Sequence, residues 1–128
     1  MASITNYLEN KLCEHVLLGQ GYVPPASIYI GLHSGNPGET GTDNELVGNG
    51  YKRAKATFGG AISGIVINDS EVLFDAATGT WPTLTYISVH DSQMGGNALF
   101  YGALSPSVVV STGNNFRIPP GNLALGFD

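Results

Sequence analysis

Four side chains within one polar segment are of the types that bind a hard divalent cation: His33, Glu39, Asp43 and Glu45. Carboxylates and loop carbonyls are the ligands that such a cation prefers. Their spacing matches no EF-hand loop, however, and a single histidine near scattered carboxylates is ordinary in a solvated loop. We therefore predict no metal site in this segment, and no cofactor for the chain.

The other residues capable of chemistry form no recognisable catalytic set. His90 and Asp91 are neighbours at the end of a predicted strand, so their side chains point to opposite faces and do not make a dyad. No serine stands in a G-x-S-x-G elbow. The glycine pairs lack the Gly-Lys-Ser/Thr tripeptide of a phosphate-binding loop. We expect no catalytic residues and therefore no enzyme.

Residues 1–21 predict one amphipathic helix. Its apolar residues recur every four positions at Ile4, Leu8, Leu12 and Val16, and Cys13 and Leu17 widen the stripe. Asn6 with Glu9 resembles a capping box, although Ser3 or Thr5 could cap the helix instead. The stripe must be covered, either by the body of its own domain or by a neighbouring subunit.

Cys13 is the single cysteine, so no internal disulfide forms. On or beside the apolar face of the helix, it is expected to be a buried, structural residue. A reactive thiolate would need a positive neighbour, and Lys11 is the nearest in the sequence.

Residues 27–128 predict a β-rich body, because the apolar period changes from four to two after Pro25. The candidate strands are 28–32, 51–58, 65–67, 72–74, 84–90, 98–103, 107–110, 115–118 and 123–127. Strands 84–90 and 98–103 are expected to form a hairpin. The spacing predicts one mainly β domain over 1–128: an antiparallel β-sandwich, jelly-roll-like, or a barrel of about eight strands, with one N-terminal amphipathic α-helix.

The segment 33–50 has no usable period, and loops of this length are usually functional or mobile. We expect it to be an arm that contacts a partner. The interface residues predicted in and around it are His33, Asn36, Glu39, Asp43, Glu45, Tyr51, Arg53 and Trp81.

The composition of the chain indicates which classes of partner it can bind. The net charge is −5, which gives no electrostatic footprint for nucleic acid. The aliphatic runs are too short to span a bilayer, and no signal peptide is evident, so we expect no membrane partner. Lys52, Arg53 and Lys55 form a small basic cluster, which favours a salt-bridging face toward a partner protein over DNA binding.

Two stretches, 30–53 and 72–104, resemble a family of short virion proteins of tailed bacteriophages, labelled tail fibre proteins or head decoration and cement proteins. The most specific pieces are Leu32-His33, the turn 36–41, Asn44-Glu45, Gly50-Tyr51, Arg53, Phe74, the run 76–81, Gly95-Gly96-Asn97 and the run 99–102. The resemblance implies a structural virion protein and carries over no catalytic residues.

Small size and the absence of repeats favour a capsid decoration or cement protein that stabilises the assembled head through repeated contacts. The alternative is a tail fibre or tail-tip protein for host recognition, with glycan binding through Trp81 and Tyr86 beside Asn97 or His90. The expected partners are the major capsid protein or tail proteins, further copies of the same chain in a homo-oligomer, and, in the alternative, a host surface glycan. The expected location is the virion, at the capsid surface or tail, after synthesis in the host bacterial cytoplasm.

Overall fold

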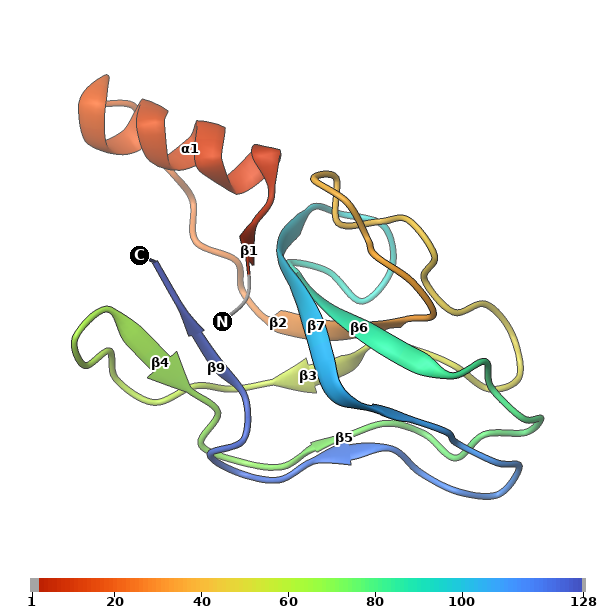
Figure 1. Cartoon of the computed structure of the whole chain (residues 1–128). Helices are drawn as coiled ribbons and strands as arrows, with labels where there is room; N and C mark the ends of the chain where they lie inside the picture. Colours follow the sequence, from red (N-terminus) through yellow and green to blue (C-terminus); the bar gives the residue numbers. More distant parts are fainter. Residues whose placement is uncertain (1–2, 128) are drawn as a thin grey trace.

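A five-stranded antiparallel sheet, in the order β1-β7-β6-β2-β3, forms the centre of the computed structural model, which describes residues 3–127 (Figure 1). Its strands are β1 (Ser3–Ile4), β2 (Ile28–His33), β3 (Ala54–Ala56), β6 (Leu84–His90) and β7 (Ala98–Val108). Two small sheets pair β4 (Ile65–Ile67) with β9 (Ala124–Gly126), and β5 (Val72–Leu73) with β8 (Arg117–Ile118). The helix α1 spans Asn6–Leu17.

The mainly β prediction is confirmed, including the N-terminal helix and the hairpin, which β6 and β7 form. The predicted strands 84–90 and 65–67 coincide with β6 and β4. The first two residues of the predicted strand 107–110 are instead the end of the long β7, and the other two lie outside any strand. Within residues 3–127 the large sheet stays open between its edge strands β1 and β3, so the sandwich-like alternative describes the fold and the barrel does not.

The hydrophobic core lies between one face of the large sheet and the two small sheets. Alternate residues of β2 and β6 face it, and the register sets Ile30 opposite Val89 and Leu32 opposite Ile87. Phe74, which follows β5, is packed into the same core and contacts the ring of Phe116. Because each fully buried aliphatic or aromatic side chain stabilises the fold by about 1.5–3 kcal/mol, this face specifies how the layers stack.

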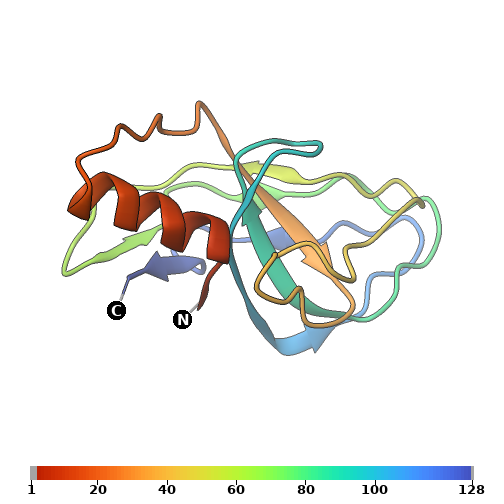
Figure 2. The same ribbon diagram turned by 90° about the horizontal axis from the view of Figure 1, so that it is seen from above.

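Part of the opposite face of the large sheet is also buried, although its residues are polar. Gly31 pairs with Ser88, and Tyr29 pairs with His90, so these side-chain positions alternate with those of the hydrophobic core. His33, Ser88 and His90 are nevertheless fully buried. The segment that covers this polar face is the long loop 34–50, which Figure 2 shows folded back beside β2 and β6.

The long loop is packed against the body rather than extended as an arm. Leu46 joins the hydrophobic core, and its amide donates to the Leu32 carbonyl at 3.0 Å. Pro37 is fully buried. The Glu39 carbonyl accepts from the amide of Asn6, at the start of α1, at 3.0 Å. The loop therefore belongs to the fold and fastens the first turn of the helix.

The helix is shorter than the predicted span 1–21 and is only partly covered. Thr5 is its N-cap, and the Thr5 hydroxyl accepts from the Leu8 amide at 3.3 Å, so the Thr5 alternative for the cap is confirmed. Leu8 is the one helix residue that is buried. Cys13 is exposed, so the prediction of a buried, structural cysteine is wrong. The helix leaves the body after its first turns, as Figure 1 shows, and the far end of its stripe lies uncovered.

No helix in the described part of the chain is long and apolar enough to cross a lipid bilayer.

Two neighbouring residues test where the core lies. Phe74 is 1% exposed and its neighbour Leu73 is 54% exposed. We predict that Phe74→Ala lowers the free energy of unfolding by about 3–5 kcal/mol. The matched variant Leu73→Ala is expected to lower it by less than about 1 kcal/mol, because it leaves no core cavity. Urea denaturation followed by circular dichroism measures both, and equal losses would contradict the layering described here.

Candidate functional site

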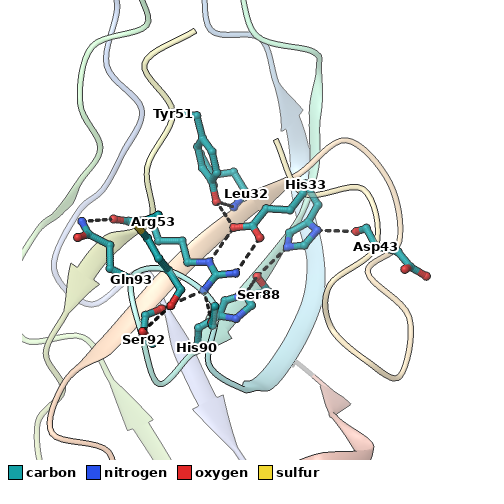
Figure 3. A network of polar contacts seen from close by, with 12 residues as sticks. Leu32, His33, Asp43, Tyr51, Arg53, Ser88, His90, Ser92 and Gln93 are labelled. Atoms are coloured by element: carbon teal, nitrogen blue, oxygen red, sulfur yellow. Dashed lines mark hydrogen bonds and ion pairs between the residues drawn. The ribbon is translucent and has the colours of Figure 1, made fainter. Parts of the chain in front are cut away.

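A largely buried ion pair lies over the polar face (Figure 3). Arg53 binds the carboxylate of Glu45 through two bonds, Nε to Oε2 at 2.8 Å and Nη2 to Oε1 at 2.9 Å. The Arg53 and Glu45 side chains are only 10% and 18% exposed. The Tyr51 hydroxyl donates to Glu45 Oε2 at 2.6 Å and accepts from the Leu32 amide at 3.0 Å. The carboxylate thereby accepts three hydrogen bonds, two from Arg53 and one from Tyr51.

Arg53 also ties a second loop into the network. Its Nη1 donates to the carbonyls of Ser92 and Gly95 at 3.0 and 2.9 Å. These carbonyls belong to the β6–β7 turn, which Asp91 closes by accepting from the Asn97 amide at 2.7 Å. One guanidinium group therefore joins the long loop, the entry to β3 and the hairpin turn.

A chain of hydrogen bonds runs from the long loop into the sheet through His33, Ser88 and His90 (Figure 3). His33 Nδ1 lies 2.7 Å from the Asp43 carbonyl, which only accepts, so Nδ1 carries the proton of the neutral ring. His33 Nε2 then accepts from the Ser88 hydroxyl at 2.7 Å. The same hydroxyl accepts from His90 Nε2 at 2.6 Å. These tautomers are assigned from the network.

The chain leaves one buried atom without a partner. Since His90 Nε2 carries the proton, His90 Nδ1 is a bare acceptor, and no residue of 3–127 donates to it. Protonation of this ring would add a buried N–H donor that has no acceptor.

The environment sets the charge states. Burial lowers the pKa of His90 to about 4, and the nearby Arg53 charge acts in the same direction. Burial also lowers the pKa of His33. Burial by itself would raise the pKa of Glu45, but the hydrogen bonds from Arg53 and Tyr51 outweigh it and lower that pKa. At neutral pH the network therefore contains two neutral imidazoles and one matched ion pair.

A serine hydroxyl bonded to an imidazole is also the arrangement of a nucleophile with its base, so the surroundings of Ser88 are relevant. Ser88 is fully buried and its oxygen already contacts both His33 and His90. The two surface hollows beside the network are lined by Arg53 and its neighbours, and neither is lined by Ser88. The hydrogen bonds of this network join the long loop and the β6–β7 turn to the sheet.

Position 31 requires a glycine, because the side chains of Ser88 and Glu45 lie close to its Cα atom. A Cβ atom at this position would lie 2.6 Å from Ser88 Oγ and 3.0 Å from Glu45 Oε2. The histidine chain and the ion pair therefore meet above a residue that has no side chain. Sequence reasoning missed this role of Gly31.

The structure brings four of the eight predicted interface residues into one network: His33, Glu45, Tyr51 and Arg53. Three others lie exposed on the long loop: Asn36, Glu39 and Asp43. Of these, Asp43 takes part in the network through its backbone carbonyl, which accepts from His33. Trp81 is buried, donates from Nε1 to the Asn49 carbonyl at 2.8 Å, and packs edge-on against the Tyr51 ring. A buried indole offers no platform to a sugar, so the glycan hypothesis has no support at Trp81.

The four candidate cation ligands do not converge. The Glu39 carboxylate accepts from the Tyr101 hydroxyl at 2.6 Å, while Glu45 faces Arg53. His33 turns inward to Ser88. Over residues 3–127, no three histidine, cysteine or acidic side chains gather so as to hold a metal ion.

Ser88 and His90 were missing from the predicted interface set. A signal for their association exists, because alternation in 84–90 sets them on the same face of a strand. That pattern is typical of a solvent-facing side, however. Only the packing of the distant loop 34–50 shows that the side is buried.

The protein is thus small and mainly β. The Glu45–Arg53 ion pair stabilises the polar face of its large sheet, and its helix projects from the body. Residues 3–126 match the family model described as podophage GP4 fiber I protein gp80, and the chain belongs to that family. The resemblance to virion proteins of tailed bacteriophages is thereby confirmed. No curated protein matches the sequence.

The hydrogen-bond chain of His33, Ser88 and His90 predicts that the free energy of unfolding decreases as the pH is lowered. The unfolded histidine titrates near pH 6.5, above the folded value of about 4, so the unfolded state takes up the proton first. The contribution of His90 to the free energy of unfolding is therefore complete above pH 6.5, the pKa in the unfolded state. It is lost as the pH falls toward about 4, the pKa in the folded state. For His90 the loss amounts to about 2 kcal/mol between about pH 7 and pH 5. His33 adds to it in the same direction.

Urea denaturation at several pH values measures this loss. His90→Gln is expected to flatten the pH dependence, whereas His15→Gln, at an exposed histidine on α1, is expected to keep it. A wild-type protein whose stability is constant over this pH range would contradict the proposed charge states.

A second prediction concerns Gly31. Gly31→Ala is expected to lower the free energy of unfolding by about 1–3 kcal/mol, because the new methyl group would push Ser88 and Glu45 out of place. Gly21→Ala is the matched control, since nothing lies within 4 Å of the Cβ that it adds. Its effect is expected to stay within about 0.5 kcal/mol. Thermal unfolding of both variants decides the point, and a stable Gly31→Ala protein would refute the close packing of the network.

Proposed function

We propose that this protein is a tail-fibre component of a podophage particle and that it attaches to a neighbouring virion protein through α1. Membership of the podophage fibre family supports the tail location better than the capsid location. The capsid decoration hypothesis rests on small size and the absence of repeats, neither of which is specific to the head.

The observation that carries the attachment role is the uncovered end of the helix. Val16, Leu17 and Leu18 are 67–75% exposed, and Val23 in the following linker is exposed as well. Covering such side chains stabilises a complex by about 1.5–3 kcal/mol each when burial is complete. The apolar stripe of α1 is expected to be buried against another surface, and the body of the protein buries it only around Leu8.

The other end of the helix is firmly held. The Thr5 hydroxyl donates to the Ala98 carbonyl at 2.7 Å, and the Thr5 amide donates to the Leu99 carbonyl at 3.0 Å. A helix of this length is marginal by itself, so a neighbour that covers its far end would also stabilise it. An amphipathic helix that enters an apolar groove is a common mode of protein recognition.

Repetition would make such a contact durable. Tail components occur in symmetric sets, and several modest contacts held together give a far stronger attachment than one. A braced and rigid body suits this role, because it lets a fibre component keep a fixed orientation beyond its attachment point.

Electron cryo-microscopy of intact particles locates the protein. Density for this fold on the tail, with α1 buried against a neighbouring chain, would support the proposal. Density on the head alone would overturn it and establish the capsid decoration alternative.

We predict that Leu17→Glu leaves the isolated protein folded but prevents its incorporation into particles. The change places a charge where an apolar contact is proposed, and in the free chain the Leu17 side chain is 75% exposed. Val109→Glu is the matched control, because Val109 is 66% exposed but lies just beyond the end of β7. Mass spectrometry of purified particles measures incorporation, and normal incorporation of the Leu17→Glu protein would refute attachment through α1.

A further inference from the structure

Two segments without charge lie at one end of the molecule. Residues 16–27 form the end of α1 and the linker that follows it, and residues 59–67 form a turn and the strand β4. Figures 1 and 2 both show α1 and the pair β4–β9 at the same end of the structure. Neither segment contains a lysine, arginine, aspartate, glutamate or histidine. We call this surface the uncharged end and define it by residues 16–27 and 59–67.

The uncharged end is rich in exposed apolar side chains, although it makes up only about a sixth of the chain. Among residues 3–127, it holds six of the eleven large hydrophobic residues that are exposed: Val16, Leu17, Leu18, Val23, Ile62 and Ile67. Their exposed fractions run from 47% to 88%. Single exposed hydrophobic residues are ordinary on a soluble protein, whereas a group of them is typical of a protein–protein contact.

A tight turn holds one of these side chains, that of Ile62, out from the body. The amides of Ile62 and Ile65 each donate to the carbonyl of the other, at 2.9 and 3.0 Å. Ser63 and Gly64 between them have φ angles of 52° and 78°, and two successive positive φ angles are those of a type I′ hairpin turn. The fold therefore presents aliphatic surface on two projections, the free end of α1 and this hairpin.

The exposed aliphatic surface matches what a stable dimer requires. At roughly 80 Å² of apolar surface for each side chain, the six offer on the order of 500 Å². A stable interface buries about 800 Å² on each partner, and a little more than half of that area is apolar. Neither projection supplies this area alone, so a partner that binds stably has to contact both.

The charge of the chain favours a second copy as that partner. Its net charge is −5, so a contact between two copies brings acidic groups toward acidic groups over most of the surface. The uncharged end avoids this repulsion. On the preceding turn of α1, Lys11 and Glu14 pair with each other at 3.7 Å. A strongly charged partner would find no opposite charge in the two segments.

We propose that the uncharged end binds the same end of a second copy, with the free end of α1 in one copy packed against the hairpin of the other. Two-fold symmetry makes the contact reciprocal, so both projections of both chains are covered at once and the complex closes as a dimer. The inference names the neighbour of α1 and in that respect rests on the attachment proposed above. Dimerisation itself requires no particle.

Sedimentation equilibrium of the full chain tests the proposal, in a reducing buffer that keeps the exposed Cys13 from forming a disulfide. We expect a monomer–dimer equilibrium that added salt does not weaken, because the contact contains no ion pair. Leu17→Glu and Ile62→Glu are each expected to raise the dimer Kd at least about tenfold, because each places two charges in an apolar contact. Val109→Glu, at an exposed aliphatic residue outside the uncharged end, is expected to keep the wild-type Kd.

Circular dichroism establishes that the three variants fold. A wild-type chain that stays monomeric at all concentrations measured, a complex of more than two chains, or a dimer that Ile62→Glu leaves intact would overturn the proposal. Failure of the attachment role is a separate result. A monomer whose incorporation into particles still depends on Leu17 contradicts only the dimer, whereas a wild-type dimer with normal incorporation of Leu17→Glu contradicts only the attachment through α1.

Discussion

The ion pair between Glu45 and Arg53 is the interaction on which the packing of the loop 34–50 against the large sheet depends. Burying two charges costs desolvation energy, and the pair is tolerated because every strong partner is present: the Tyr51 hydroxyl and two turn carbonyls complete its hydrogen bonds. The pair holds the loop 34–50 over the sheet. That loop in turn buries the histidine chain and fixes the first turn of α1.

Much of the fold could be predicted from the sequence, because its core depends on local patterns. The alternation in 84–90 and the apolar run 65–67 gave β6 and β4 their bounds. The polar network could not be predicted in the same way. His33, Glu45 and Arg53 are individually visible as polar residues near a loop. The bonds of His33 to Ser88 and of Arg53 to the β6–β7 turn, however, link distant segments and leave no periodic signal.

In the helix α1, by contrast, a clear sequence pattern predicts burial that the structure does not show. Its apolar period predicts a covered stripe, and in the isolated chain the stripe is uncovered beyond its first turns. The mismatch supports the proposed attachment, because neighbouring exposed aliphatic side chains, such as those of Val16, Leu17 and Leu18, are typical of a protein–protein contact. Together with membership of a podophage fibre family, this is why we propose attachment through α1.

Amide hydrogen exchange tests the central claim most directly, namely that the loop 34–50 is a structural part of the sheet and not a free arm. The amides of Ser34, Asp43 and Leu46 donate within the fold, so the account predicts that they exchange as slowly as those of β2. It also predicts much faster exchange in the last turn of α1. Exchange of the three loop amides at the rate of that helix end would contradict the account.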